Sequence, residues 1–205
     1  KLERFGVVSL EDRSILRRLC VPITPVGARM EVAREGERPD SVFVLLEGMA
    51  CRYKLRANGT RQILAYLVPG DFCDIDIGLV ERRDHAIGSL SACRFARLDF
   101  APLGDLVAEQ APVIKTLRQA NLVDEATLRE WLVNLGSRSA IERIAHLFLE
   151  LLMRLRAIGL ARGDGYDLPV SQLDLADTTG LSTVHVNRTL QDLKRQGLIE
   201  LRSRI

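Results

Sequence analysis

Histidine, aromatic residues and net charge are all scarce in this chain of 205 residues. It has three histidines and 5% aromatic residues, and its 29 basic and 27 acidic side chains leave a formal charge of +2. So small a net charge does not by itself indicate a nucleic-acid-binding protein, and any DNA-binding surface has to be local. A metal-dependent enzyme on a cupin-like barrel needs two or three histidines with a carboxylate. Since His146 and His185 fall in the helical part and no Ser-His-Asp set or P-loop is evident, we do not expect an enzyme.

Cysteine is also sparse, and its spacing excludes the common cysteine-based sites. The four cysteines lie far apart, with no C-x-x-C pair, at Cys20, Cys51, Cys73 and Cys93. We therefore expect reduced structural thiols, with no metal site and no iron–sulfur cluster. No run of about 18 apolar residues and no signal peptide is present, which predicts a cytoplasmic protein without a membrane span.

Residues 22–100 show the pattern of β structure, with short apolar stretches separated by turn signals. The clearest are S-V-F-V-L-L-E-G-M-A-C-R-Y-K-L at 41–55, A-N-G-T at 57–60, and Q-I-L-A-Y-L-V-P-G-D-F at 62–72. Asn-Gly between apolar runs is a strong hairpin signal, and many short strands favour a sandwich or barrel. A short helix capped by Ser9 is predicted before them, over residues 9–19.

After about residue 102 the apolar spacing becomes helical. A helix of more than 20 residues is predicted, followed by a break near Gly136, a new helix capped by Ser137 or Ser139, and a loop over 159–169. A narrow apolar seam on a long helix is typical of an interface with a partner helix, and packing on the chain's own barrel is the alternative. The predicted seam consists of Ile114, Leu117, Asn121, Leu128, Trp131, Leu132 and Leu135.

Residues 170–196 read as two helices joined by a tight turn. Ser171 is placed to cap the first helix, Thr178-Thr179-Gly180-Leu181 to form the turn, and Ser182 to cap a second helix that ends at Gly197. Two helices joined by a short turn containing glycine form a helix–turn–helix, whose second helix fits the DNA major groove. Residues 198–201 are predicted to begin a wing strand.

The second helix has a polar side opposite its apolar one. Arg188 is the best candidate for reading guanine, because a guanidinium pairs with O6 and N7; a phosphate contact is the alternative. Asn187 suits adenine or phosphate, and the start of the first helix suits phosphate. The predicted DNA-binding residues are Ser171, Gln172, Ser182, Thr183, Val184, His185, Asn187, Arg188, Gln191 and Arg195.

The order barrel, long helix, hinge and helix–turn–helix resembles the Crp/Fnr family of bacterial transcription regulators. The markers are E-G-E-R-P-D-S-V-F-V-L-L-E-G (35–48), L-V-P-G-D-F (67–72), R-S-A-I-E-R-I-A (138–145) and the helix–turn–helix. The resemblance implies an α+β fold with a cyclic-nucleotide-binding-like jelly-roll barrel at 1–105, a dimerisation helix and hinge at 106–136, and a winged helix–turn–helix at 137–205. It also implies a homodimer on a near-palindromic operator in double-stranded DNA. RNA polymerase is a candidate further partner.

The resemblance places an effector pocket along residues 71–90 and the long helix, where this chain departs from members that bind cyclic AMP. Those members carry Gly-Glu after P-G-D-F, Arg-Ser for the phosphate, and Thr-Ser on the long helix. This chain has Asp74-Ile75 followed by Asp76, then Arg83-Asp84, and then Leu128-Arg129. An aspartate beside a phosphate adds like-charge repulsion, which argues against cyclic AMP.

Other cofactors known in the family find no support either. The cysteine cluster of the oxygen-sensing branch has no counterpart, and His85 alone in the barrel region does not make a haem site. The effector is thus left unassigned. The alternative is a ligand-independent regulator whose barrel is a dimer scaffold or docking surface. The reading helix also carries Thr183 and Val184 where the family usually has Arg and Glu, which predicts a different operator.

Overall fold

A computed structural model describes residues 9–73, 79–108 and 112–202. They form two compact units. The first contains residues up to 52 together with 66–127, and the second contains 53–65 together with residues from 128 onward. Over the described ranges, no helix combines the length and the apolar character needed to cross a membrane.

The first helix is the predicted one. Helix α1 spans Leu10–Leu19, and Ser9 caps it in a capping box with Asp12. The Ser9 hydroxyl accepts a hydrogen bond from the Asp12 N–H at 3.0 Å, and the Asp12 carboxylate accepts one from the Ser9 N–H at 2.9 Å. These two bonds satisfy amide groups that a helix start leaves without intrahelical partners.

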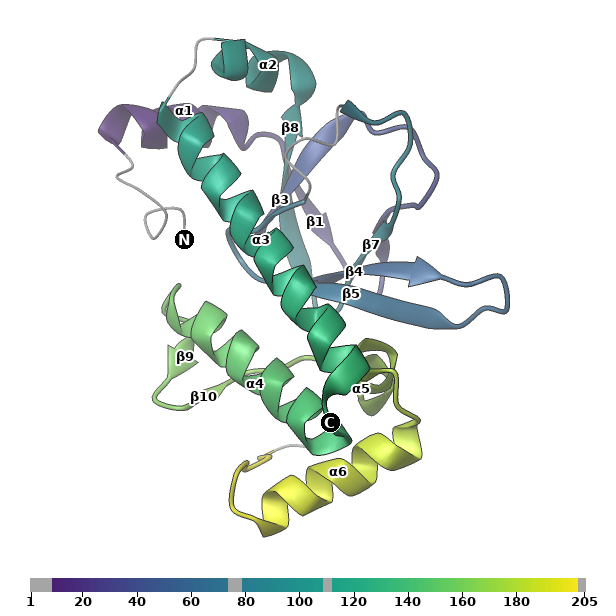
Figure 1. The fold of residues 1–205 in the computed structure, drawn as a ribbon. Coiled ribbons are helices and arrows are strands. Elements are labelled where there is room, and N and C mark those ends of the chain that lie inside the picture. The colour runs from purple at the N-terminus through teal and green to yellow at the C-terminus, as the bar shows by residue number, and fades with distance from the viewer. Residues whose placement is uncertain (1–8, 74–78, 109–111, 203–205) are drawn as a thin grey trace. The chain divides into compact units, whose positions relative to one another are not determined.

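Two four-stranded sheets follow within the described residues (Figure 1), ordered β1-β8-β3-β6 and β2-β7-β4-β5. Their strands are β1 Ile23–Val26, β2 Glu31–Ala33, β3 Ser41–Glu47, β4 Ala50–Leu55, β5 Arg61–Leu67, β6 Phe72–Cys73, β7 Ala86–Ser89 and β8 Cys93–Asp99. The pairing of β3 with β8 is antiparallel and sets Val44 opposite Ala96. Gly59, at φ +81°, closes the β4–β5 hairpin at the predicted turn, where Arg56 N–H bonds Thr60 O at 2.9 Å.

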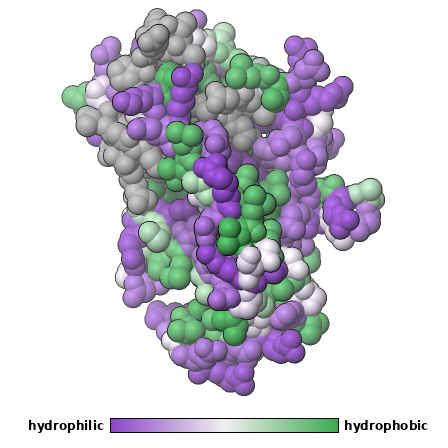
Figure 2. Space-filling model, in the orientation of Figure 1, coloured by the Kyte–Doolittle hydropathy of each residue, from purple (hydrophilic) through white to green (hydrophobic). Residues whose placement is uncertain are grey.

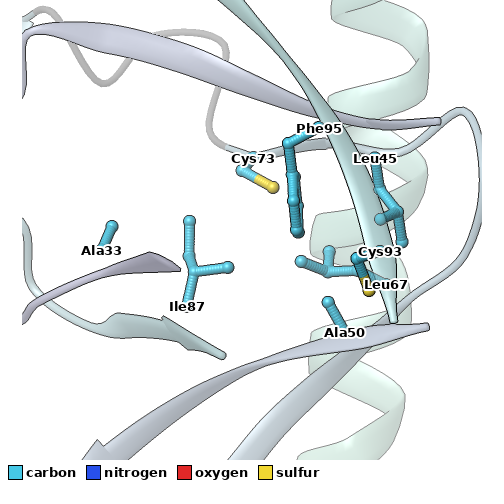
Figure 3. Close-up of a cluster of buried hydrophobic side chains, with 8 residues drawn as sticks. All are labelled: Ala33, Leu45, Ala50, Leu67, Cys73, Ile87, Cys93 and Phe95. Atoms are coloured by element: carbon cyan, nitrogen blue, oxygen red, sulfur yellow. The ribbon is translucent and has the colours of Figure 1, made fainter. Parts of the chain in front are cut away.

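Alternate residues of these strands point inward and build the barrel core. The cluster drawn in Figure 3 is made of Ala33, Leu45, Ala50, Leu67, Cys73, Ile87, Cys93 and Phe95. Phe43 meets Phe95 edge to face at 6.3 Å between ring centroids. All four cysteines are thiols, and Cys51, Cys73 and Cys93 are buried. Their environment agrees with the structural role expected from the sequence.

Helices α2 (Phe100–Ala108) and α3 (Pro112–Ser137) follow the barrel strands. Ile114 and Leu117 of α3 are buried with Val42, Val44, Ala96, Leu98 and Leu103, against which Ile15, Leu16 and Leu19 of α1 also pack. Farther along α3, the Arg52 guanidinium of β4 lies 3.9 Å from the Asp124 carboxylate. The first part of α3 is therefore a component of the barrel's own core.

The second unit is built around helix α4, Ala140–Arg156, which Ser139 caps in a capping box with Glu142. Its Ile144, Leu147, Leu151 and Leu155 are buried, and α4 contacts both α5 (Gln172–Thr179) and α6 (Thr183–Arg195). The segment predicted as a plain loop contains a small hairpin, β9 (Ala161–Arg162) paired with β10 (Gly165–Tyr166). The Tyr166 hydroxyl donates to the Phe148 carbonyl at 2.9 Å and so ties this hairpin to α4.

The predicted wing strand at 198–201 is not formed, because these residues lie outside any strand. Two backbone bonds, from Gly197 N–H to Lys194 O at 3.0 Å and from Leu198 N–H to Leu193 O at 3.0 Å, fold the chain back on the end of α6. Gly197 has φ +68°, which is the left-handed conformation of a helix end.

Candidate functional site

Helix α5 opens with a capping box, as α1 and α4 do. The Ser171 hydroxyl accepts from the Asp174 N–H at 3.1 Å, and Asp174 Oδ2 accepts from the Ser171 N–H at 2.7 Å. The Asp174 side chain is only 1% exposed. Thr178 and Thr179 were predicted in the turn, but both are helical and buried, with hydroxyls donating to the carbonyls of Asp174 and Leu175. Helix α5 thus runs through Thr179, and the turn itself starts at Gly180.

Gly180 has φ +67° and ends α5, and Ser182 caps α6 two residues later. The His185 N–H donates to the Ser182 hydroxyl at 3.2 Å. The predicted cap residues and the glycine are thus in the positions expected from the sequence. A left-handed glycine lets the chain reverse sharply enough for α6 to return across α5.

Helix α6 has one buried side and one exposed side. Val186, Leu190 and Leu193 are buried as predicted, and so is Thr189, whose hydroxyl donates to the His185 carbonyl at 2.8 Å. The exposed side carries Thr183, Val184, Asn187, Arg188, Gln191 and Arg195. Val184 is 78% exposed although it is apolar. The buried side of α6 packs against its own chain, and the exposed side remains available to a binding partner.

Two contacts describe how this exposed side is arranged. The Asn187 amide donates to Gln172 Oε1 of α5 at 3.3 Å, so the starts of the two helices are in contact. Arg195 forms an ion pair with Asp192 one turn before it. Arg195 is therefore partly neutralised, whereas Arg188 adds an exposed positive charge to the middle of the helix.

A pocket of about 370 Å³ opens in the first unit. It is lined by Val32, Ala33, Glu37, Arg38, Asp40, Phe43, Arg83 and Arg97. Arg83 is 4% exposed; its Nη2 donates to the Ser41 carbonyl at 2.9 Å, and its guanidinium lies 5.3 Å from the Phe43 ring centroid. Its Nη1 is buried and has no hydrogen-bond partner among the described residues.

Of the predicted effector-pocket residues that the structure describes, only Arg83 lines this one. Asp84, also predicted for the pocket, is not part of the lining: its carboxylate is 77% exposed and contacts His85 Nδ1 at 2.7 Å. In the segment before β7, Arg83 is thus buried and Asp84 is exposed. Leu128 and Arg129 are exposed on α3 and are not part of the lining. Asp74, Ile75 and Asp76 lie outside the described residues.

The seam predicted on α3 needs a correction as well. Ile114 and Leu117 are buried in the barrel core, and Trp131 is buried with its indole N–H donating to Glu150 Oε2 of α4 at 2.7 Å. These three side chains are buried by contacts within their own chain. The Asn121 amide donates to Glu125 one turn on, and Leu135 is half-buried.

Other apolar side chains of α3 are exposed in the structure. In Figure 2, hydrophobic patches interrupt the hydrophilic surface along this helix. The exposed set includes Leu128 and Leu132 from the predicted seam and adds Leu122, Val123 and Val133. Sequence spacing found the helix, but it could not separate the side that packs inward from the side left outside.

Models of known protein families match both the barrel region and the helix–turn–helix region of this chain. Residues 26–110 match the cyclic nucleotide-binding domain model, and residues 142–205 match the Crp-like helix-turn-helix domain model. Such a barrel followed by this helix–turn–helix defines a class of DNA-binding transcription regulators.

Relatives identify the family. The chain is 34% identical over 171 residues to the nitrogen fixation regulation protein FixK of Bradyrhizobium diazoefficiens, covering 83% of this chain and 70% of that protein. It is 30% identical over 178 residues to the transcriptional activatory protein AadR of Rhodopseudomonas palustris, covering 84% and 71%. The solved structure of FixK2 from Bradyrhizobium japonicum superposes with a TM-score of 0.78 at 25% identity over 89% of this chain and 88% of that one.

This chain belongs to the Crp/Fnr family, and it is a DNA-binding transcriptional regulator. The regulators of this family act as dimers. The resemblance inferred from the sequence is thereby confirmed, as is the α+β fold with a β barrel and a terminal helix–turn–helix.

Proposed function

We propose that two copies of this chain bind a near-palindromic DNA site and that each inserts the exposed side of α6 into the major groove. The main support is the contrast between the two sides of α6. One side is packed against the chain, and the other exposes Thr183, Val184, Asn187, Arg188 and Gln191. Ser171 and Gln172, at the start of α5, are placed for phosphate contacts. Residues 1–105 act as the sensor barrel, 106–136 as dimerisation helix and hinge, and 137–205 as the DNA-binding domain of a cytoplasmic protein.

Base reading is assigned to Arg188. Its long exposed side chain carries five donors, and among the described residues no carboxylate contact neutralises it as Asp192 neutralises Arg195. Val184 offers methyl groups to thymine, and Asn187 reaches adenine when it releases Gln172. Since Thr183 and Val184 replace the charged pair usual in the family, the operator differs from the familiar one.

The test uses a DNA duplex selected with the wild-type protein from a random-sequence pool. Arg188→Ala should weaken binding by about 1–3 kcal/mol and relax preference at one base pair in each half-site. Lys194→Ala on the same helix removes an equal charge and should weaken binding to all sequences equally. Unchanged affinity and base preference in Arg188→Ala would remove Arg188 from the reading role.

We further propose that a small effector with an anionic group occupies the barrel pocket. The buried Nη1 of Arg83 supplies an unused donor there, and Arg38 and Arg97 add positive charge against Glu37 and Asp40. Because these carboxylates line the same pocket, a multiply charged phosphate is disfavoured relative to a small carboxylate. In a thermal-shift screen, small organic acids that bind the pocket should raise the unfolding temperature of the wild type and leave that of Arg83→Gln unchanged. Operator affinity that no bound compound alters would favour the ligand-independent alternative.

A further inference from the structure

Arg61, the first residue of β5, makes two ionic contacts with the first helix of the DNA-binding motif. Its Nε donates to Asp177 Oδ2 at 2.7 Å, and its Nη2 donates to Asp174 Oδ1 at 2.5 Å. Next to it, the Gln62 amide donates to the Thr178 carbonyl at 3.2 Å. All of these residues belong to the second unit, in which the tip of the β4–β5 hairpin is grouped with the helices. The sequence alone did not single out Arg61.

The burial of these groups makes the contact more than a surface ion pair. The side chains of Arg61, Asp177 and Asp174 are 26%, 16% and 1% exposed. Burial lowers the pKa of Arg61, but the hydrogen bonds that it donates to Asp177 and Asp174, together with their negative charges, outweigh burial and raise the pKa above its ordinary value. Removing one partner from such a buried site costs more than breaking an exposed pair.

Asp174 links this contact to the start of α5. Its Oδ1 accepts from Arg61, while its Oδ2 accepts from the N–H and the hydroxyl of Ser171 at 2.7 and 2.8 Å. The same carboxylate therefore caps the helix and holds the hairpin. Gln172, which follows Ser171 and is the first residue of α5, contacts Asn187 on the exposed side of α6. Any loss of order at Asp174 is passed to the surface proposed to meet DNA.

The negative charges of Asp174 and Asp177 give a second reason why Arg61 affects DNA binding. Asp174 and Asp177 place two negative charges on an eight-residue helix whose start is proposed to meet a phosphate. Carboxylates within a Debye length of about 8 Å repel an incoming phosphate unless a cation compensates them. Arg61 is bonded to both of them at once. It thus offsets charges that would otherwise oppose DNA at this helix.

We propose that Arg61 is a positioning residue for DNA binding, which fixes the start of α5 and neutralises its two carboxylates so that a phosphate can dock there. The inference rests on the proposed mode of DNA binding by α5 and α6. Arg61 touches no base itself, so it governs affinity and not sequence preference. A residue of the β4–β5 hairpin thereby sets how well the helix–turn–helix binds.

The experiment compares operator affinity of the full chain carrying Arg61→Ala, Arg61→Lys or Arg56→Ala, using the selected duplex. Arg56 is an exposed arginine on the same hairpin, so its removal is the control with equal charge. We expect Arg61→Ala to bind about tenfold more weakly at low salt, with unchanged base preference and a defect that shrinks as salt screens the carboxylates. Arg61→Lys should recover part of the loss, and Arg56→Ala should stay within about twofold of wild type.

A second variant separates charge compensation from a simple loss of stability. Asp177→Asn added to Arg61→Ala removes one uncompensated carboxylate and should recover several-fold in affinity, while circular dichroism verifies that each variant is folded at the assay temperature. Equal affinities for Arg61→Ala and Arg56→Ala would overturn the inference, as would a defect that neither salt nor Asp177→Asn relieves. A silent Arg188→Ala beside a defective Arg61→Ala would refute the base-reading role and leave the role of Arg61 standing.

Discussion

At the scale of single residues, Gly48 occupies a tight point of the barrel. It joins β3 to β4 with φ +88°, and a Cβ built on it would lie 2.3 Å from the Ala92 carbonyl oxygen and 2.8 Å from Cys93 Sγ. Neither the backbone oxygen nor the buried sulfur can move away without disturbing β8. Glycine is therefore required both by its dihedral angle and by lack of space.

Gly48→Ala should lower the free energy of unfolding by at least about 2 kcal/mol, because strain at positive φ adds to a steric clash. The matched control is Gly59→Ala, at φ +81° in the β4–β5 turn, where nothing lies within 4 Å of the added Cβ. That control should lose only about 1 kcal/mol. Urea unfolding of both variants measures the difference, and equal losses would show that the Ala92 contact is unimportant.

Residues with local roles were those the sequence predicted well. Ser9, Ser171 and Ser182 are caps because a hydroxyl and an amide three residues away satisfy each other, whatever surrounds the helix. Arg61 was missed because its partner Asp174 is 113 residues away, and only the folded chain brings them together. Arg83 was predicted for the effector pocket and lines the pocket described above, but the exposure of Asp84 depends on the course of the chain before β7, which a residue pair does not reveal.

At the scale of elements, the junction of α3 and α4 is held by a small polar cluster. The Trp131 indole N–H and the Arg154 guanidinium donate to the two oxygens of Glu150, at 2.7 and 2.9 Å. The His146 ring lies beside Trp131, with ring centroids 5.5 Å apart. Because Trp131 ends up between these helices, it fixes the course of the chain as it enters the DNA-binding domain.

This cluster predicts a pH dependence of stability. The pKa of His146 is lowered, first by burial and then by the charge of Arg138, while Glu150 and Glu130 oppose the shift. An unfolded histidine keeps a pKa of about 6.5, so below that pH the unfolded state binds a proton before the folded state does. Stability is then complete above pH ~6.5 and falls as the pH drops toward the lowered pKa.

Urea unfolding of the wild type at several values between pH ~7.5 and ~5 should show this fall, and His146→Gln should have a flatter profile over the same range. The glutamine variant serves as the control, since it keeps a polar side chain of similar size without a titrating ring. A wild type and a variant with the same slope would assign the pH dependence to other groups.

Elements with a strong period were predicted with few errors. The spacing of Val186, Leu190 and Leu193 gave α6 and its buried side, and the strand region ends where periodicity changes after β8. The prediction of a wing strand at 198–201 was wrong, because apolar residues beyond Gly197 form a strand only where a neighbouring strand offers hydrogen bonds. On α3, Ile114 and Leu117 pack in the barrel core, and Trp131 bonds Glu150. These are tertiary contacts, which periodicity does not encode.

At the scale of the whole molecule, the exposed apolar side chains of α3 carry the proposed dimer. Leu128, Leu132 and Val133 share the exposed part of one helix after Trp131 has turned inward. Burying a leucine of this kind contributes about 1.5–3 kcal/mol, and the same contact is made twice across a two-fold axis. The dimer then presents two α6 helices to one DNA site.

Leu132→Asp should shift the protein to monomers at micromolar concentration and reduce operator affinity by at least about tenfold, because a monomer holds only one half-site. Sedimentation velocity and DNA titration measure the two effects. Leu10→Asp changes an even more exposed leucine on α1 and should alter neither. A Leu132→Asp protein that stays dimeric would move the interface elsewhere on the chain.

Methylation interference at guanine N7 on the selected duplex tests the central claim most directly. If Arg188 of each protomer reads a guanine, then methylating either of two symmetry-related guanines about one DNA turn apart should block wild-type binding. The same methylations should no longer discriminate with Arg188→Ala. Interference that is absent, falls in one half-site only, or persists unchanged in Arg188→Ala would contradict the reading of the major groove by the exposed side of α6.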